Sequence, residues 1–542
     1  MKKGYKLLSI VVLLFCYVQL RGQNTEDEML SKIQSITKTF LTKNVSDTTY
    51  SILRVEKKEL KNHKTYFLVH LSPKGFLMLS PESSKPVWAY SLENNFSMQP
   101  DKQIFTDAIL LDISKQKPAK PQLKKAYTEI STGPFIHTLW GQVNCYDNHN
   151  NIINVTNYYT PSNYAAGCVA ISMSLVLHFY KWPIHGIGSF TYSDNQGSST
   201  GTYSANFINT YYAWNQMLER YRYRSSTLEQ RQAAGELVYQ VAVALRTDFE
   251  FNGSTSNVNR IPAAGKNYFR FNGLEHKPSS STFWKLLYTN LVNGIPVVLA
   301  VKADNGAGHS IVCDGLKIDK TGDHYYHLNM EWWGDSNGWY RIRDTWNAGG
   351  YTSITDGIFY LLPIPEAIAP HYEDGADKIT FSWNYPSKVN TEAFEVQEKI
   401  GTGKWTSITT TVQDTFLIVD RHPNTEQYFR VRAKVAGRWP DYSWSNEVRA
   451  YMDNTGIPDY ATSGRIKVSP NPVVNHLDID LGSFPAISLQ VFDIVGHKMI
   501  QKYLLPGESN FGLDVQFLTK GVYIVRLMDN QNKIKTVKFI KK

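Results

Sequence analysis

The spacing of apolar residues changes character several times along this chain of 542 residues. Between residues 24 and 115, apolar side chains recur at helical spacing over 29–41. Short apolar runs follow at 65–71, 75–80 and 87–91, each with a length typical of a strand. This part of the chain is therefore predicted to form a helix and a small antiparallel sheet.

A longer, domain-sized segment spans residues 128–362, in which helical patterns come first and strand patterns later. This order predicts an α+β domain with a helical half and a sheet half. The helical patterns lie at 169–180, 205–222, 227–246 and 281–292. The strand patterns lie at 294–301, 308–315 and 324–330, and the first of them has the continuous apolar character of a buried strand.

The remaining chain predicts two all-β domains. Over 366–452, apolar and polar residues alternate in short runs, which predicts a seven-stranded sandwich with Trp383 and Tyr428 in its core. A further all-β unit is expected over 463–542. A chain of this length is too long for a single core. The predicted fold class is that of a multidomain protein with two α+β parts followed by two all-β, sandwich-type domains.

The first 22 residues have the pattern of a secretory signal peptide. Lysines at positions 2, 3 and 6 precede the apolar stretch 7–20, which is shorter than a membrane-spanning helix. Cleavage is expected near Gly22, and no later segment reaches the length of a transmembrane helix. The mature protein is therefore expected to leave the cytoplasm in soluble form.

A basic stretch separates the first α+β part from the second. Between residues 115 and 125 it contains five lysines and two prolines but few apolar residues. Such a composition is typical of an exposed linker that proteases can cut. Residues 23–127 are therefore expected to form an N-terminal segment that ends in a cleavable linker.

Charge and cysteine content narrow the classes of function. The formal net charge of +9 comes from basic residues scattered along the chain, so binding to nucleic acid is not expected. Once Cys16 is removed with the signal, Cys145, Cys168 and Cys313 remain, and an odd number argues against a disulfide framework. At least one thiol is thus free or pairs with another chain. No Cys or His pair has metal-ligand spacing, so neither a metal nor another cofactor is expected.

Cys168 stands directly before the helical run 169–180 and after the small residues 165–167. It is therefore predicted at a helix N-terminus, where free backbone N–H groups and the helix dipole favour a thiolate over a thiol. From this stretch alone, a nucleophile and a small core residue are both open interpretations. The presence of a suitable base elsewhere in the domain decides between them.

A thiolate nucleophile needs a base that takes its proton and later gives it to the leaving amine. His178 lies on the same predicted helix, about 15 Å further along the axis, and so cannot reach the thiol. His309 opens an apolar strand and lies 141 residues after Cys168 (309 minus 168). This separation falls within the roughly 130 to 150 residues expected for papain-like proteases. His309 is therefore the predicted partner of Cys168.

Further residues are candidates for completing a catalytic site. Gln142, upstream of the nucleophile, has a side-chain amide that can join the Cys168 backbone N–H in an oxyanion hole. Asn329 ends a strand expected to pair with the strand of His309, so its amide oxygen can orient the imidazole. A surface amide is the alternative role of Gln142. Trp332 or Trp333 would shield the contact with the histidine from water, with ordinary core packing as the alternative, and Trp332 and Gly308 would contact the substrate.

Four motifs occur in a set order along the second α+β part. They are Gly167-Cys168-Val169-Ala170, Pro296-Val297, the stretch 308–315 (GHSIVCDG), and His327-Leu328-Asn329 followed by Trp332. Together they resemble the streptopain family, the C10 cysteine peptidases of the papain-like clan, over about 128–362. The resemblance implies Cys168 as nucleophile, His309 as general base and Gln142 in the oxyanion hole. The stretches 75–80 and 86–91 resemble the inhibitory propeptide of that family, which implies an autoinhibited zymogen.

The chain departs from the family pattern beside the histidine's expected partner. Where the family usually reads Asn-Trp-Gly-Trp-Gly-Gly, this chain has Asn329-Met330-Glu331-Trp332-Trp333-Gly334. Met330 thus replaces a tryptophan and Glu331 replaces a glycine. The shape of the substrate groove and the shielding of His309 are expected to differ from those of the family, while nucleophile and base are retained.

The two C-terminal domains also resemble known types. The stretch 469–472, the turn 493–496, the stretch 521–523 and the basic end are similar to the type A sorting domain of the type IX secretion system. This resemblance implies a Bacteroidetes-type bacterium, passage across the outer membrane, and removal of the tail during secretion or anchoring. Residues 366–452 resemble a fibronectin type III domain, whose expected role is that of a spacer.

These features predict a secreted cysteine endopeptidase that hydrolyses peptide bonds through a Cys168 thioester. Its expected partners are protein or peptide substrates, its own propeptide and the type IX secretion machinery, outside the cell or at its surface. The alternative is a binding protein with a catalytically degenerate peptidase fold, which Met330 and Glu331 favour. A transglutaminase-like acyl transferase would use the same cysteine–histidine chemistry, but the order of the motifs follows the streptopain family.

Overall fold

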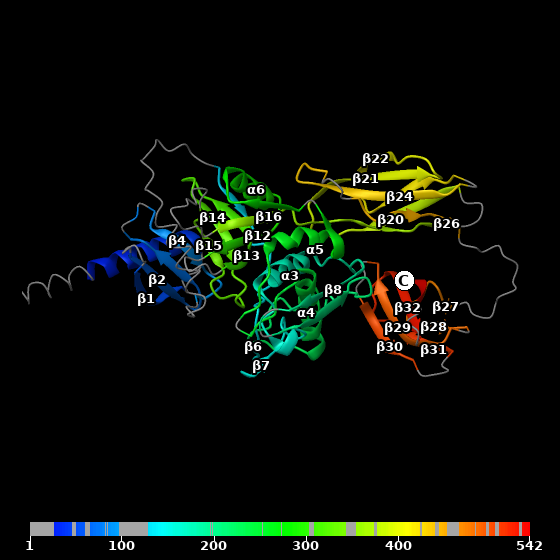
Figure 1. The fold of residues 1–542 in the computed structure, drawn as a ribbon, viewed down its shortest axis with the longest axis horizontal. Coiled ribbons are helices and arrows are strands. Elements are labelled where there is room, and N and C mark those ends of the chain that lie inside the picture. Colours follow the sequence, from blue (N-terminus) through cyan, green and yellow to red (C-terminus); the bar gives the residue numbers. More distant parts are fainter. Residues whose placement is uncertain are drawn as a thin grey trace, which may run out of the picture.

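The computed structural model describes most of the chain, from the N-terminal strands to the C-terminal sheets (Figure 1). The described residues are 27–45, 50–59, 65–96 and 128–542, except 82, 84, 196, 198, 252, 273, 303–307, 343–353, 373–376, 413, 423–424, 440–443, 453–465, 483, 495–497, 505–508 and 530–533. The predicted signal peptide and the predicted linker at 115–127 lie outside them. The helices of the described residues are all too short or too polar to span a bilayer. The expected fold class, α+β parts followed by all-β domains, is confirmed.

The N-terminal part has a helix packed on a small sheet, as its apolar pattern predicts. Residues 27–44 are helical, and Ile33 is buried against side chains of the strands. The strands pair in sequence order, each antiparallel to the next. They are β1 (Ser51–Glu59), β2 (Thr65–Ser72), β3 (Phe76–Leu79) and β4 (Val87–Ser91).

This sheet continues into the central domain, because β4 pairs with β15. The path of the 11-stranded sheet is β1-β2-β3-β4-β15-β14-β13-β12-β16-β11, with β5 attached to β13. The apolar run at 294–301 yields the buried strand β12, as expected. The central strands are β5 (Ile130–Thr132), β11 (Glu275–Pro278), β12 (Val297–Lys302), β13 (Gly308–Ile318), β14 (His324–Asn329), β15 (Gly338–Tyr340) and β16 (Ile354–Phe359).

The helices of the central domain gather beside this sheet (Figure 1). They are α3 (Cys168–Tyr180), α4 (Leu228–Ala244), α5 (Ile261–Tyr268) and α6 (Ser281–Val292). α3 packs against both α4 and β13 and is apolar on nearly all sides, which is the composition of a helix inside a core. It begins at Cys168, as predicted. The preceding residue, Gly167, has a φ of 87°, a left-handed conformation that glycine adopts without a steric penalty.

The helix expected over 205–222 does not form. After residue 206, turns and isolated bridges occupy this stretch, and four of its five aromatic side chains are buried, while Tyr211 is exposed. The hydroxyl of Tyr212 donates to Gln240 Oε1 at 2.8 Å, and that of Tyr221 donates to the Gln230 carbonyl at 2.7 Å. These tertiary contacts outweigh the local helical pattern.

The short elements of the domain are η1 (Pro161–Asn163), η2 (Val258–Arg260), β6 (Cys145–Tyr146), β7 (Ile152–Ile153), β8 (Ser189–Asp194), β9 (Gly201–Asn206), β10 (Phe271–Asn272) and β17 (Leu362–Pro363).

The next domain is a sandwich of the sheets β18-β20-β23 and β22-β21-β24-β25, which confirms the seven-stranded prediction for the described residues. Trp383 is buried, as expected, but the prediction for Tyr428 is wrong. Neighbouring strand residues face opposite sides, and Phe429 occupies the core while the Tyr428 hydroxyl donates to Glu426 at 2.6 Å. The strands are β18 (Glu366–Ile368), β19 (His371–Tyr372), β20 (Lys378–Asn384), β21 (Thr391–Ile400), β22 (Thr406–Val412), β23 (Phe416–Asp420), β24 (Gln427–Val435), β25 (Val448–Arg449) and β26 (Tyr451–Met452).

Direct contacts attach this sandwich to the central domain. The carboxyl group of Glu366 accepts from His185 at 2.9 Å and from Arg270 at 3.1 Å. Apolar side chains of the sandwich and of the central domain also belong to one continuous core. The sandwich is therefore packed against the central domain and not merely joined to it by the chain.

The last domain is all-β, as predicted, and has a core of its own. Its sheets are β27-β28-β31 and β30-β29-β32-β33. A pocket of about 290 Å³ lies between this domain and the central one, with Glu236 of α4 and Lys498 among its lining residues. The strands are β27 (Lys467–Ser469), β28 (His476–Asp480), β29 (Ala486–Asp493), β30 (Lys498–Tyr503), β31 (Asn510–Asp514), β32 (Gly521–Asp529) and β33 (Ile534–Lys541).

Candidate active site

Segments that are far apart in the sequence meet at the N-terminus of α3. The backbone N–H of Ala166 donates to the Gln142 carbonyl at 2.9 Å, which places Gln142 beside the residues that lead into Cys168. Gly141 forms an antiparallel bridge with Trp332. Because α3 also packs on β13, the strand of His309, the fold brings together the segments of all the predicted site residues.

Cys168 is partly buried at the first position of α3. The backbone N–H groups of Ser310 and Val169 are close enough to lower the pKa of its thiol, and Ser310 directly follows the predicted base. Burial raises the pKa of the Cys168 thiol to about 12, and the nearby Glu331 carboxyl group also raises it, while the N–H groups lower it. The pKa of Cys168 is thus shifted in the direction opposite to that expected from the helix N-terminus alone, because the loss of hydration outweighs the stabilisation of the thiolate by the helix N-terminus.

His309 is buried on the second position of β13, with 8% of its surface exposed. Its ring stacks on the indole of Trp332, with ring centroids 5.4 Å apart and an angle of 16° between the planes. Nε2 lies 3.1 Å from the Met330 carbonyl oxygen, and burial lowers the pKa of the imidazole to about 4. A neutral imidazole that donates from Nε2 keeps Nδ1 as an acceptor. With the proton on Nε2, Nδ1 is the ring nitrogen that can accept a proton.

Asn329 lies at the end of β14, which pairs with β13 as expected. Its Nδ2 donates to the Thr138 carbonyl at 3.0 Å, and its Oδ1 accepts from the backbone N–H of Glu331 at 3.1 Å. The amide therefore fixes the backbone around Met330, whose carbonyl faces His309. Direct orientation of the imidazole by the Asn329 side chain stays a prediction, and the sequence pattern gave no signal for the backbone carbonyl that holds Nε2.

Gln142, Gly308 and Trp332 occupy different positions around the predicted catalytic pair of Cys168 and His309, which we call the dyad. Gln142 is partly buried. At the neighbouring Gly141, an added Cβ atom would lie 2.5 Å from Nε1 of Trp333. Only glycine therefore allows this close packing of the indole. Gly308 is exposed at the start of β13, and Trp332 is buried against the His309 ring. The oxyanion role of Gln142 and the substrate contacts of Gly308 and Trp332 stay predictions.

The N-terminal segment contacts the turn that follows Trp332 and Trp333. The backbone N–H of Ser336 donates to the Asn95 carbonyl at 2.9 Å. β4 extends the same contact by pairing with β15, where Trp339 lies opposite Tyr90. The segment predicted as an inhibitory propeptide thus contacts the loop that carries Trp332.

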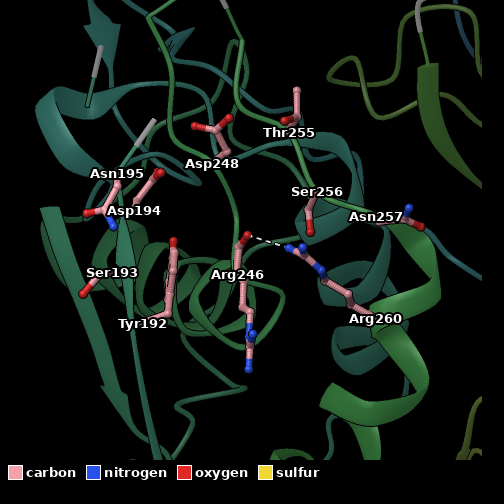
Figure 2. Close-up of a pocket in the computed structure, with 10 residues that line it drawn as sticks. All are labelled: Tyr192, Ser193, Asp194, Asn195, Arg246, Asp248, Thr255, Ser256, Asn257 and Arg260. Carbon is pink, nitrogen blue, oxygen red and sulfur yellow. Dashed lines mark hydrogen bonds between the residues drawn. The ribbon is translucent and has the colours of Figure 1, made fainter. Parts of the chain in front are cut away.

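A pocket of about 460 Å³, shown in Figure 2, lies between β8 and the loop that follows α4. Its lining residues include Asp194, Asp248, Arg246 and Arg260. Arg260 donates to the Arg246 carbonyl at 2.8 Å, the bond drawn in Figure 2. The same loop approaches Cys168, because a Cβ on Gly167 would lie 3.2 Å from the Ser254 carbonyl oxygen. The pocket is lined by polar and charged residues, and neither Cys168 nor His309 is among them.

Comparison with known families assigns three parts of the chain. Residues 140–340 match the family model described as Peptidase C10 family, 367–441 match a PBP1-like, fibronectin3-like domain, and 467–542 match a secretion system C-terminal sorting domain. The predicted resemblances to these three types are thereby confirmed. The sorting domain indicates export from the cell.

Similar proteins support the same assignment for the central domain. Streptopain of Streptococcus pyogenes is 23% identical over 328 residues, which cover 55% of this chain and 80% of streptopain. The thiol protease/hemagglutinin PrtT of Porphyromonas gingivalis is 29% identical over 177 residues, which cover 32% of this chain and 20% of that protein. This homology supports a cysteine peptidase.

Two solved structures of Prevotella intermedia proteins are also similar. A prointerpain A fragment with a cysteine replaced by alanine is 24% identical and has a TM-score of 0.42, covering 56% of this chain and 98% of the fragment. Active interpain A cysteine protease is 27% identical, with a TM-score of 0.34, covering 44% of this chain and 98% of that chain.

Proposed function

We propose that this protein is a secreted cysteine endopeptidase of streptopain type, made as an autoinhibited zymogen. The observation that carries the proposal is the meeting of Cys168, at the start of α3, with the His309 segment of β13. The match of residues 140–340 to the C10 family supports the same chemistry. Cys168 is the nucleophile, His309 is the general base and acid, and Gln142 contributes to the oxyanion hole.

The reaction begins with transfer of the Cys168 thiol proton to Nδ1 of His309. The sulfur attacks the peptide carbonyl carbon, and the resulting oxyanion is stabilised by the Cys168 backbone N–H and the Gln142 amide. The imidazolium then gives its proton to the leaving amine, which leaves an acyl thioester on Cys168. Water, deprotonated by His309, attacks the thioester, and the thiol takes the proton back as the acid is released.

Residues 23–127 would act as the intramolecular inhibitor. The contact of Asn95 with Ser336 and the pairing of β4 with β15 support this role, because both hold the segment against the loop of Trp332. Cutting of the basic linker near 115–127 would release it. The C-terminal sorting domain supports export by the type IX secretion machinery to the cell surface or the medium.

The test compares casein cleavage and self-processing in three proteins: the parent chain, Cys168→Ala and Cys145→Ala. Cys145 is a matched control because it is also a free thiol, buried in β6. Cys168→Ala should abolish both activities, while Cys145→Ala should retain them. Undiminished proteolysis by Cys168→Ala would contradict the assignment.

A binding protein with a degenerate peptidase fold is the second candidate. The Glu331 carboxyl group favours it, because this group contributes to raising the pKa of the Cys168 thiol. Reaction with the epoxide thiol inhibitor E-64 separates the two candidates. A reactive Cys168 is modified, whereas the thiol of a degenerate site is not.

A further inference from the structure

Glu331 is a carboxyl group buried beneath the candidate active site, and the proposed reaction does not use it. None of its surface is exposed. Its Oε1 accepts a hydrogen bond from the Ser172 hydroxyl, and its Oε2 is a buried oxygen without a hydrogen-bond partner among the described residues. The Ser172 hydroxyl also lies 2.7 Å from that of Ser310. Glu331, Ser172 and Ser310 form what we call the carboxyl–serine chain.

The carboxyl–serine chain joins the segments that carry the dyad. Ser172 lies one helical turn beyond Cys168 on the same face of α3. Ser310 follows His309 in β13, and its backbone N–H is close enough to lower the pKa of the Cys168 thiol. Glu331 itself follows Met330, whose carbonyl holds His309 Nε2. A change at this carboxyl group is thereby transmitted to both members of the dyad.

The surroundings of Glu331 favour its uncharged form. A buried carboxylate with an unpartnered oxygen loses its hydration without replacement, and burial accordingly raises the pKa of Glu331 well above its usual range. The titratable group that it influences is the Cys168 thiol from α3, while the His309 imidazole from β13 contacts the carbonyl of the neighbouring Met330. Its other neighbours on these elements and on its own loop are the hydroxyls of Ser172 and Ser310 and the Asn329 amide, which carry no charge.

We propose that Glu331 is a positioning residue that, as an uncharged carboxylic acid, holds α3 and β13 together through Ser172 and Ser310. When Glu331 loses its proton, its charge opposes formation of the Cys168 thiolate. The reactivity of Cys168 therefore rises less with pH than it would without this carboxyl group. The inference rests on the proposed function only in that Cys168 is the reacting group.

The test measures the rate at which iodoacetamide alkylates Cys168 in the full chain between about pH 5 and pH 9, read by mass spectrometry of the Cys168 peptide. Glu331→Gln keeps the shape of the side chain but cannot ionise. Near about pH 9, the alkylation rate of Cys168 in Glu331→Gln should exceed that in the parent by about three- to tenfold. This ratio corresponds to a Cys168 thiol pKa that is lower by roughly half a unit to one unit. Glu236→Gln is the control, because Glu236 is a carboxyl group on α4 whose pKa is also raised, and it lines the pocket against the C-terminal domain.

Superimposable profiles for the parent and Glu331→Gln would overturn the inference. Ser172→Ala provides a second route if Glu331→Gln does not fold. Because the Ser172 hydrogen bond lowers the pKa of Glu331, its loss should keep the carboxyl group neutral to higher pH and speed alkylation in the same direction. Casein cleavage is measured in parallel. A shifted alkylation profile without cleavage would refute the proposed function alone, and cleavage with an unshifted profile would refute the role of Glu331 alone.

Discussion

Protonation of the buried imidazole of His309 should make the central domain sensitive to mild acid. Burial lowers the pKa of His309 to about 4 from an ordinary value of 6.5. Since the unfolded chain takes up this proton near pH 6.5 and the folded protein only near pH 4, the free energy of unfolding falls as the pH drops through this window. A difference of about 2.5 pKa units corresponds to a loss of about 3 kcal/mol. The stabilising effect of the neutral ring is fully present above pH 6.5.

The assay is urea unfolding, followed by tryptophan fluorescence, at several values between about pH 4 and pH 7.5. The parent is the Cys168→Ala protein, which cannot digest itself if the proposed mechanism holds. Between pH 7.5 and pH 4, the free energy of unfolding of His309→Gln should fall by about 3 kcal/mol less than that of the parent, because the glutamine does not titrate. The exposed His149→Gln serves as the control and should follow the parent. An equal pH dependence for His309→Gln and the parent would refute the buried, neutral His309.

Three further changes test the site. Gly141→Ala would place a Cβ 2.5 Å from the Trp333 indole, so urea unfolding should show a loss of about 1–3 kcal/mol and casein cleavage should fall. Asn329→Ala leaves the buried Thr138 carbonyl without its amide donor, so the free energy of unfolding should drop by about 1–3 kcal/mol, whereas an unchanged value would contradict this contact. Asn95→Ala removes the side-chain acceptor of the Gly75 N–H in the N-terminal segment. A loss of about 1 kcal/mol in the stability of this segment should speed self-processing of the zymogen, followed on gels, about fivefold.

The sequence was most informative where local chemistry decides the structure. The small residues before Cys168 and the apolar run after it predict where α3 begins, and the structure confirms this start. The apolar runs likewise predict the pairing of the strands that carry His309 and Asn329. In each case the pattern repeats over several residues, so a single unusual side chain does not change the outcome.

The sequence was less informative where distant groups decide the structure. Alternation alone did not separate Tyr428 from Phe429, because a shift of one position along a strand exchanges its two faces. The Met330 carbonyl that holds His309 belongs to the backbone, which no residue pattern marks. Glu331 was visible as a departure from the family pattern, but its burial against Ser172 depends on α3, far away in the sequence.

The most direct test of the central claim is E-64 labelling of the self-processed protein, with the modified cysteine identified by peptide mass spectrometry. The account predicts one inhibitor molecule on Cys168 and no labelling of Cys145 or Cys313. Failure of the processed parent to react, or modification at another cysteine, would contradict the assignment of Cys168 as the nucleophile.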